Sequence, residues 1–107
     1  MAYISLSDST TTSLKVRVAG LDSNYNNTTR RVDWTAKIGS TTYASTYQYL
    51  ANQIVVGNII TLSPLSAGTE YKITAVISNI NGGSYPDVTL IDYFSTIGEG
   101  DPLEPPN

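Results

Sequence analysis

The chain has 107 residues, neither cysteine nor histidine, and a formal net charge of -3. Without these residue types it lacks the commonest general base, any thiol nucleophile and the usual ligands of zinc. Its acidic surplus lies in Glu99, Asp101 and Glu104, and the other 6 acidic residues balance the 6 basic ones. The rest of the chain therefore has no formal net charge. This argues against nucleic acid or an anionic membrane as partner, because proteins that bind either usually carry an excess of basic residues. We therefore predict a protein that is not an enzyme and uses no cofactor or metal.

The N-terminal segment Met1–Ser5 shows neither the basic start nor the apolar stretch of a signal peptide. Apolar runs are only a few residues long, so no membrane insertion is expected. The length is that of one domain, which we place at residues 1–97. Residues 98–107 combine three prolines with three acidic residues and predict a linker or a disordered tail.

The first two strands are predicted from alternating apolar and polar residues, since successive side chains of a strand point to opposite faces. Tyr3–Leu6 forms a short first strand, followed by a polar turn over Asp8–Thr12. Leu14–Ala19 alternates more regularly and places Val16 in the core.

An Asn-rich loop precedes the third strand, Arg31–Ile38, in which Trp34 points inward. The loop spaces Asp22, Asn24 and Asn26 like the start of a calcium loop, with Asp33 further along. Asn27 stands where such a loop needs glycine, so we expect no calcium. Asn26 and Asn27 each begin an N-glycosylation triplet, and the preferred interpretation of the loop is an ordinary polar turn.

The next segment, Thr41–Tyr49, is predicted as a strand after a hairpin turn at Gly39–Ser40. Tyr43, Tyr47 and Tyr49 all occupy odd-numbered positions of this strand, so strict alternation would place them on one face. These rings either form an aromatic platform for a sugar or a protein, or face the core or cover a neighbouring strand. The second interpretation is favoured because aromatic residues are common in strands anyway.

The segment after this strand is the least regular. Leu50–Gln53 is predicted as a connection, and Gln53–Leu62 holds two β-branched runs separated by Gly57–Asn58, which marks a turn or a bulge. Ile60 and Leu62 are expected to face the core.

A polar corner then leads into the most regular strand of the chain. One face of this strand carries four apolar residues at alternate positions: Tyr71, Ile73, Ala75 and Ile77. The other face is polar except for Val76. Core positions are therefore predicted at Ile73 and Tyr71, together with Trp34, Leu65 and Val16.

Five residues of this corner form a recognisable motif: Leu65, Gly68, Thr69, Glu70 and Tyr71. In identity and spacing they resemble the turn between strands E and F of a fibronectin type III domain. Ala67 departs from it, since the family has proline there. The resemblance implies that the Tyr71 hydroxyl bonds to the backbone near Leu65 or Ser66. The family often carries its core tryptophan on the second strand, whereas this chain carries Trp34 on the third, as immunoglobulin-type sandwiches do.

A last strand is predicted at Val88–Thr96, after a turn at Asn81–Gly82. Its register stays open between two alternatives. Strict alternation points Asp92 inward, and a bulge near Leu90 instead brings Ile91 and Tyr93 inward.

Together these elements predict an all-β fold, a seven-stranded antiparallel sandwich of the immunoglobulin-like, fibronectin type III kind, with another bacterial immunoglobulin-like sandwich as the alternative. The resemblance implies a non-catalytic module that spaces or docks neighbouring domains in an extracellular, surface, secreted or phage structural protein, and that is a monomer in isolation. The alternative function is glycan or protein binding, through the loops before the third and last strands and an outer sheet face that carries Tyr43, Tyr47, Tyr49, Val76, Tyr85 and Tyr93.

Overall fold

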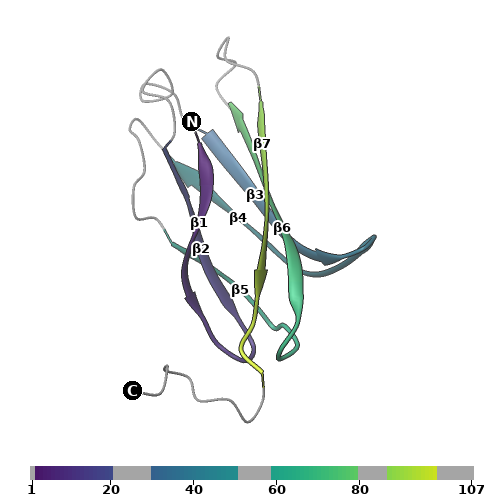
Figure 1. Cartoon of the computed structure of the whole chain (residues 1–107). Helices are drawn as coiled ribbons and strands as arrows, with labels where there is room; N and C mark the ends of the chain where they lie inside the picture. The colour runs from purple at the N-terminus through teal and green to yellow at the C-terminus, as the bar shows by residue number, and fades with distance from the viewer. Residues whose placement is uncertain (1, 21–29, 51–58, 80–86, 99–107) are drawn as a thin grey trace.

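The computed structural model describes residues 2–20, 30–50, 59–79 and 87–98, and within these ranges it is all-β (Figure 1). Seven strands follow one another along the chain: β1 (Tyr3–Ser9), β2 (Leu14–Ala19), β3 (Arg30–Ile38), β4 (Thr41–Leu50), β5 (Ile60–Leu62), β6 (Glu70–Asn79) and β7 (Val88–Ser95). They form a three-stranded sheet in the order β1-β2-β5 and a four-stranded sheet in the order β4-β3-β6-β7, with every pair antiparallel. No helix that could cross a membrane occurs in these ranges.

The core lies between the two sheets and consists of the inward-facing residues of alternating strands. Trp34, Val16, Ile73 and Tyr71 are fully buried, and Leu65 is 6% exposed. The Trp34 indole keeps a polar partner in this setting, because its Nε1 donates a hydrogen bond of 3.0 Å to Gln48 Oε1. Ile60 is half-buried and packs against the same core as Leu62.

β1 is longer than the sequence indicates. The alternation ends at Leu6, but pairing with β2 resumes after a register shift between Leu6 and Asp8 and continues to Ser9. A bulge of this kind breaks the two-residue period while leaving the ladder in place. The turn is therefore confined to the residues around Thr10, whose Oγ1 accepts hydrogen bonds from the backbone N–H groups of Thr12 and Ser13.

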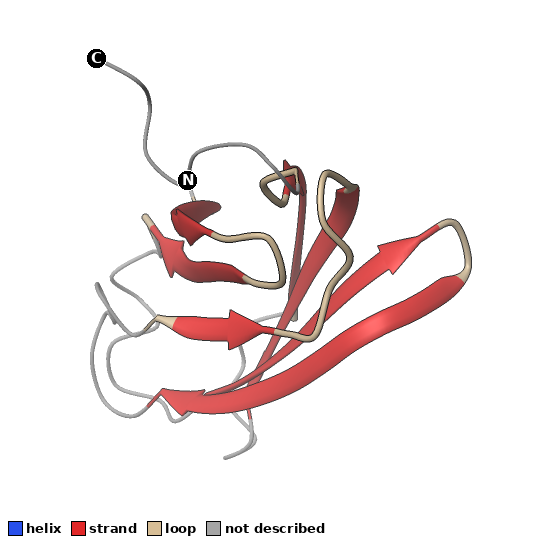
Figure 2. Ribbon diagram, turned by 90° about the horizontal axis from the view of Figure 1, so that it is seen from below, coloured by secondary structure: helices blue, strands red, loops and turns tan. Residues whose placement is uncertain are grey.

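β4 also extends beyond the predicted boundary. Leu50, placed by the sequence in a connection, is the last residue of β4 and pairs with Arg30. The β3–β4 hairpin reaches past the other strands on one side of the sandwich (Figures 1 and 2). The suggested turn or bulge at Gly57–Asn58 lies outside the described residues.

β7 follows strict alternation and pairs with β6 without a register shift. Asp92 therefore lies opposite the buried Ile73, on the inner side of the sheet, yet it is exposed because β7 is an edge strand. Ile91 and Tyr93 point outward and are more than half exposed. The alternative with a bulge near Leu90 is wrong.

The corner between β5 and β6 is fixed by the buried Tyr71. Its hydroxyl accepts a hydrogen bond of 2.8 Å from the backbone N–H of Ser66, the contact that the resemblance implies. Gly68 turns the chain with a φ of 59°, a conformation that other residues rarely adopt. A Cβ on Gly68 would also lie 3.2 Å from the Cα of Gly98, so a side chain here is disfavoured twice.

Thr96, the first residue after β7, ties the last strand to this corner. It is 5% exposed, and its hydroxyl donates to the carbonyl of Ser66 and accepts from the N–H of Thr69 at 3.1 Å. Its own N–H donates to the carbonyl of Thr69 at 3.0 Å. Ser66 thus has its N–H held by Tyr71 and its carbonyl held by Thr96.

Replacing Trp34 by alanine should lower the free energy of unfolding by about 3–5 kcal/mol, because it removes a fully buried ring and leaves a cavity. Urea denaturation measures the change. The matched control is Tyr93→Ala, which removes a ring that is 55% exposed and should change stability by no more than about 0.5 kcal/mol. Equal losses in the two variants would contradict the assignment of Trp34 to the core.

The two bonds to Ser66 should prove coupled. Tyr71→Phe should cost about 0.5–1.5 kcal/mol, and Thr96→Val about 1–3 kcal/mol because it leaves a backbone donor and acceptor without their partner. The double variant should lose at least about 0.5 kcal/mol less than the sum, since either loss already loosens Ser66. Simple additivity in urea denaturation would show that the two bonds act independently.

Candidate functional site

The outer face of the four-stranded sheet carries most of the exposed large side chains that the sequence nominated for binding. Arg31 and Asp33 of β3 lie directly opposite Tyr49 and Tyr47 of β4, and directly opposite residues share a face. Tyr47 and Tyr49 are each 53% exposed. The preferred interpretation is therefore wrong for these two rings where it has them face the core, whereas its other part, in which they cover a neighbouring strand, agrees with their contacts to Arg31 of β3.

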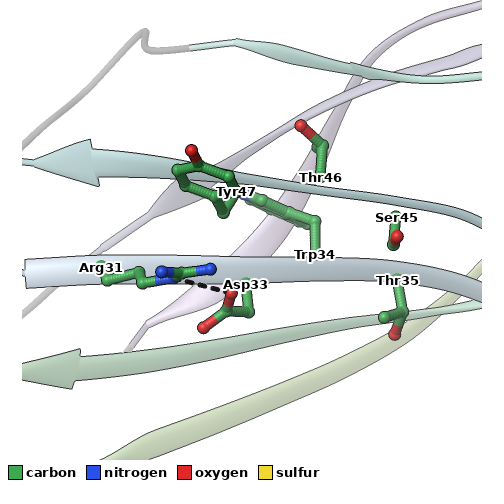
Figure 3. A pocket seen from close by; sticks show the side chains of 7 residues that line it. All are labelled: Arg31, Asp33, Trp34, Thr35, Ser45, Thr46 and Tyr47. Carbon is green, nitrogen blue, oxygen red and sulfur yellow. Dashed lines mark hydrogen bonds and ion pairs between the residues drawn. The ribbon is translucent and has the colours of Figure 1, made fainter.

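Tyr47, Tyr49, Arg31 and Asp33 touch one another and form what we call the aromatic–arginine cluster (Figure 3 shows three of the four). The two tyrosine rings meet edge to face, with centroids 5.6 Å apart. The Arg31 guanidinium lies 4.2 Å above the Tyr47 centroid and 5.9 Å from that of Tyr49. The Arg31 Nε donates a hydrogen bond of 2.9 Å to Asp33 Oδ1, and the same two side chains form an ion pair.

The bond from Asp33 raises the pKa of Arg31 above its ordinary value, and the small desolvation of the guanidinium opposes that shift without reversing it. Arg31 therefore stays protonated at every pH at which a protein of this kind is folded. The cluster holds a fixed positive charge beside a carboxylate, and both side chains are more than a third exposed.

The cluster borders an open hollow of about 410 Å³ on the sheet surface. Its lining also includes residues further along β3 and β4: Trp34, Thr35, Ser45 and Thr46. Asp33 is engaged by Arg31, and one face of the Tyr47 ring is covered by the guanidinium. The groups best suited to hold a ligand are thus already satisfied by one another, which leaves the Tyr49 ring and the hydroxyls of the hollow for any partner.

Tyr43 lies apart from this cluster, although it shares the sequence parity of Tyr47 and Tyr49. The β3–β4 register shifts between Ala36 and Lys37, and Tyr43 is the residue of β4 left without a partner on β3. Its ring packs edge to face on the fully buried Tyr71, at 5.7 Å between centroids. The prediction that the three tyrosines line one face is wrong, because a bulge reverses the alternation.

The remaining nominated residues are spread across the sheet. Val76 is half-buried and lies opposite Asp33, in the row of Tyr47. Tyr93 lies at the far edge, opposite Lys72, and borders a second open hollow of about 350 Å³ that Lys37 and Glu70 also line. Tyr85 and the loops before β3 and β7 lie outside the described residues.

In the described part of the chain, no three acidic side chains come together in a group that could hold a metal ion. Of the residues weighed for calcium, Asp33 lies in β3, paired with Arg31, and Asp22, Asn24 and Asn26 lie outside the described residues. Sequence reasoning missed Arg31, whose signal was its position two residues before Asp33 on the same strand face.

Comparison with known proteins identifies the architecture. No family model and no curated protein matches the chain. Among solved structures, the solution structure of the fn3 domain of the human collagen alpha-1(XX) chain aligns with a TM-score of 0.61, over 99% of this chain and 88% of that one, at 18% identity. The chain has the fibronectin type III fold. That fold is generally a non-catalytic module of larger proteins.

The ion pair in the aromatic–arginine cluster should contribute little to stability and should be screened by salt, because both partners are well exposed. Asp33→Asn should shift the urea midpoint slightly at low ionic strength, and the shift should vanish near about 1 M salt, where the Debye length is about 3 Å. Glu70→Gln serves as the control, since Glu70 makes no ion pair among the described residues. A large shift of the urea midpoint that persists at high salt would contradict the assignment of Arg31 and Asp33 to a solvent-exposed ion pair.

Proposed function

We propose that this fibronectin type III fold acts as a non-catalytic module that spaces or docks neighbouring domains of a larger extracellular, surface, secreted or phage structural protein. The observation that carries the proposal is the dispersal of the nominated binding side chains. Tyr47 and Tyr49 lie with Arg31, Tyr43 packs on Tyr71, and Tyr93 sits at the opposite edge. Ligand-binding surfaces of monomers usually group their apolar side chains into one patch.

The chemistry of the exposed groups supports the same proposal. General acid–base and nucleophilic catalysis need an acid, a base and a stabilising group that face one substrate position. The chain has no histidine or cysteine, and the two carboxylates that line the hollows of the described residues lie at different hollows: Asp33, which is bonded to Arg31, at the first and Glu70 at the second. A module of this composition acts through its shape and surface.

A second candidate function is binding of a glycan or a protein on the outer face of β4-β3-β6-β7. The observation in its favour is the exposed Tyr47–Tyr49 pair beside a hollow lined with hydroxyl groups. Tyrosine offers an apolar ring with a polar tip, which suits such ligands.

The two functions separate in an experiment on the polypeptide that carries the domain. Exchanging the domain for an unrelated sandwich of similar length should preserve a spacer role, and Tyr49→Ala should leave the assembly of the polypeptide unchanged. A glycan array and a pull-down with the isolated chain should show no ligand that Tyr49→Ala abolishes. A ligand lost in Tyr49→Ala but retained in Tyr93→Ala, with both variants folded, would establish the binding function instead.

A further inference from the structure

The four edge strands of the sandwich are unequal. The edges are β1 and β5 in one sheet and β4 and β7 in the other. An edge strand offers a row of backbone N–H and C=O groups to any additional strand, and soluble proteins interrupt such rows with bulges, charges or short strands. Which edge lacks an interruption is therefore informative about where the molecule pairs with another chain.

Three edges are interrupted. β1 carries a register shift between Leu6 and Asp8, together with the charge of Asp8. β5 is only 3 residues long. In β7, Asp92 places its carboxylate over the edge, where Oδ1 accepts the backbone N–H of Tyr93 at 2.7 Å. That N–H is occupied, and a strand added to β7 would bring its backbone against a carboxylate.

β4 is different. Its 10 residues, TTYASTYQYL, include no charged residue, no proline and no glycine. The bulge at Tyr43 lies near one end, and Ala44–Leu50 pairs with β3 at every position. β4 is an edge strand of the four-stranded sheet (Figure 2). Within residues 2–20, 30–50, 59–79 and 87–98, no strand pairs with the side of β4 that faces away from β3. The segment has the high β-propensity and low charge typical of strands that pair between chains.

We propose that β4 pairs antiparallel with β4 of a second copy of this chain, across a two-fold axis, and joins the two outer sheets into one continuous sheet. Pairing of all seven bulge-free residues Ala44–Leu50 fixes the register, because the axis then passes at their midpoint, Tyr47. Tyr47 faces Tyr47 of the second copy, and Tyr49 faces Ser45. The aromatic–arginine clusters of both copies come side by side on the same outer face.

Charge favours a second copy as the occupant. The strand is uncharged, so no charged side chain of β4 meets another across the axis. On the adjacent β3, Arg31 and Asp33 neutralise each other at 2.9 Å. The chain without its last segment has 6 acidic and 6 basic residues, so the net charge of -3 comes from that segment and not from the residues of the sandwich. The sequence alone predicts a monomer, and the edge of β4 over Ala44–Leu50, which is free of bulges and charges, is the observation that argues for a dimer.

Disulfide trapping tests the register directly, since the chain has no cysteine of its own. Cα atoms of directly opposed residues in an antiparallel pair lie about 4.5–5.5 Å apart, within the range that a disulfide spans. Under mild oxidation, Tyr47→Cys should form a covalent dimer of the full chain. The control, Tyr93→Cys, is equally exposed on the same face but lies on the interrupted edge, and should remain a monomer.

Sedimentation equilibrium over a concentration series tests the unmodified chain. The wild type should dimerise reversibly, and Tyr47→Lys should weaken the dimer about tenfold or more, because it removes a ring pair and sets two like charges opposite each other. Tyr93→Lys should leave the dissociation constant unchanged. A monomer at every concentration, or a dimer that both lysine variants weaken equally, would overturn the proposal, as would cross-linking of the two cysteine variants at the same rate.

Discussion

The hydrogen bonds around Ser66 are the constraint on which the sandwich depends. Tyr71 holds the N–H of Ser66 from β6, and Thr96 holds its carbonyl from the end of β7. The same end of the molecule joins the other sheet, since the N–H of Leu65 donates to Thr12 and that of Ile97 donates to Thr10. Three chain segments distant in sequence are thus fixed to one another, and the two sheets cannot separate at this end without breaking several bonds.

The register of β6 follows from this constraint. With the Tyr71 ring buried and its hydroxyl bonded, Ile73, Ala75 and Ile77 must also face inward, and a slip of one residue would turn all of them to solvent. β3 pairs with β6 over eight consecutive positions, so the phase of Trp34 is set by the same strand. The central strands need no other specification, which is why alternation alone was sufficient to predict them.

The predictions from sequence were wrong at the positions where a strand departs from the two-residue alternation of its side chains. The bulges between Leu6 and Asp8 and at Tyr43 leave no mark in composition, and each displaced a boundary or a face. The sequence left open whether Tyr47 and Tyr49 form an exposed platform or face the core or cover a neighbouring strand, because the answer depends on β4 being an edge strand, which is a matter of tertiary arrangement. Thr96 looked like the end of a strand, and only the meeting of the corner with the β7 terminus reveals its three bonds.

The described side chains of β4 contribute little apolar surface to the core, and this bears on the open edge of the strand. Of the inward-facing β4 side chains that the structure describes, Ala44 is buried but small, and Thr46 and Gln48 are only half-buried. The strand is held by its ladder to β3, by the bond from Trp34 to Gln48 and by the packing of Tyr43 on Tyr71. Strands with few buried apolar contacts open most easily. A second ladder on the open side of β4 would therefore add backbone hydrogen bonds to a strand with little buried apolar surface among its described side chains, and the same addition at β7 would have to displace the bond of Asp92 to its own edge.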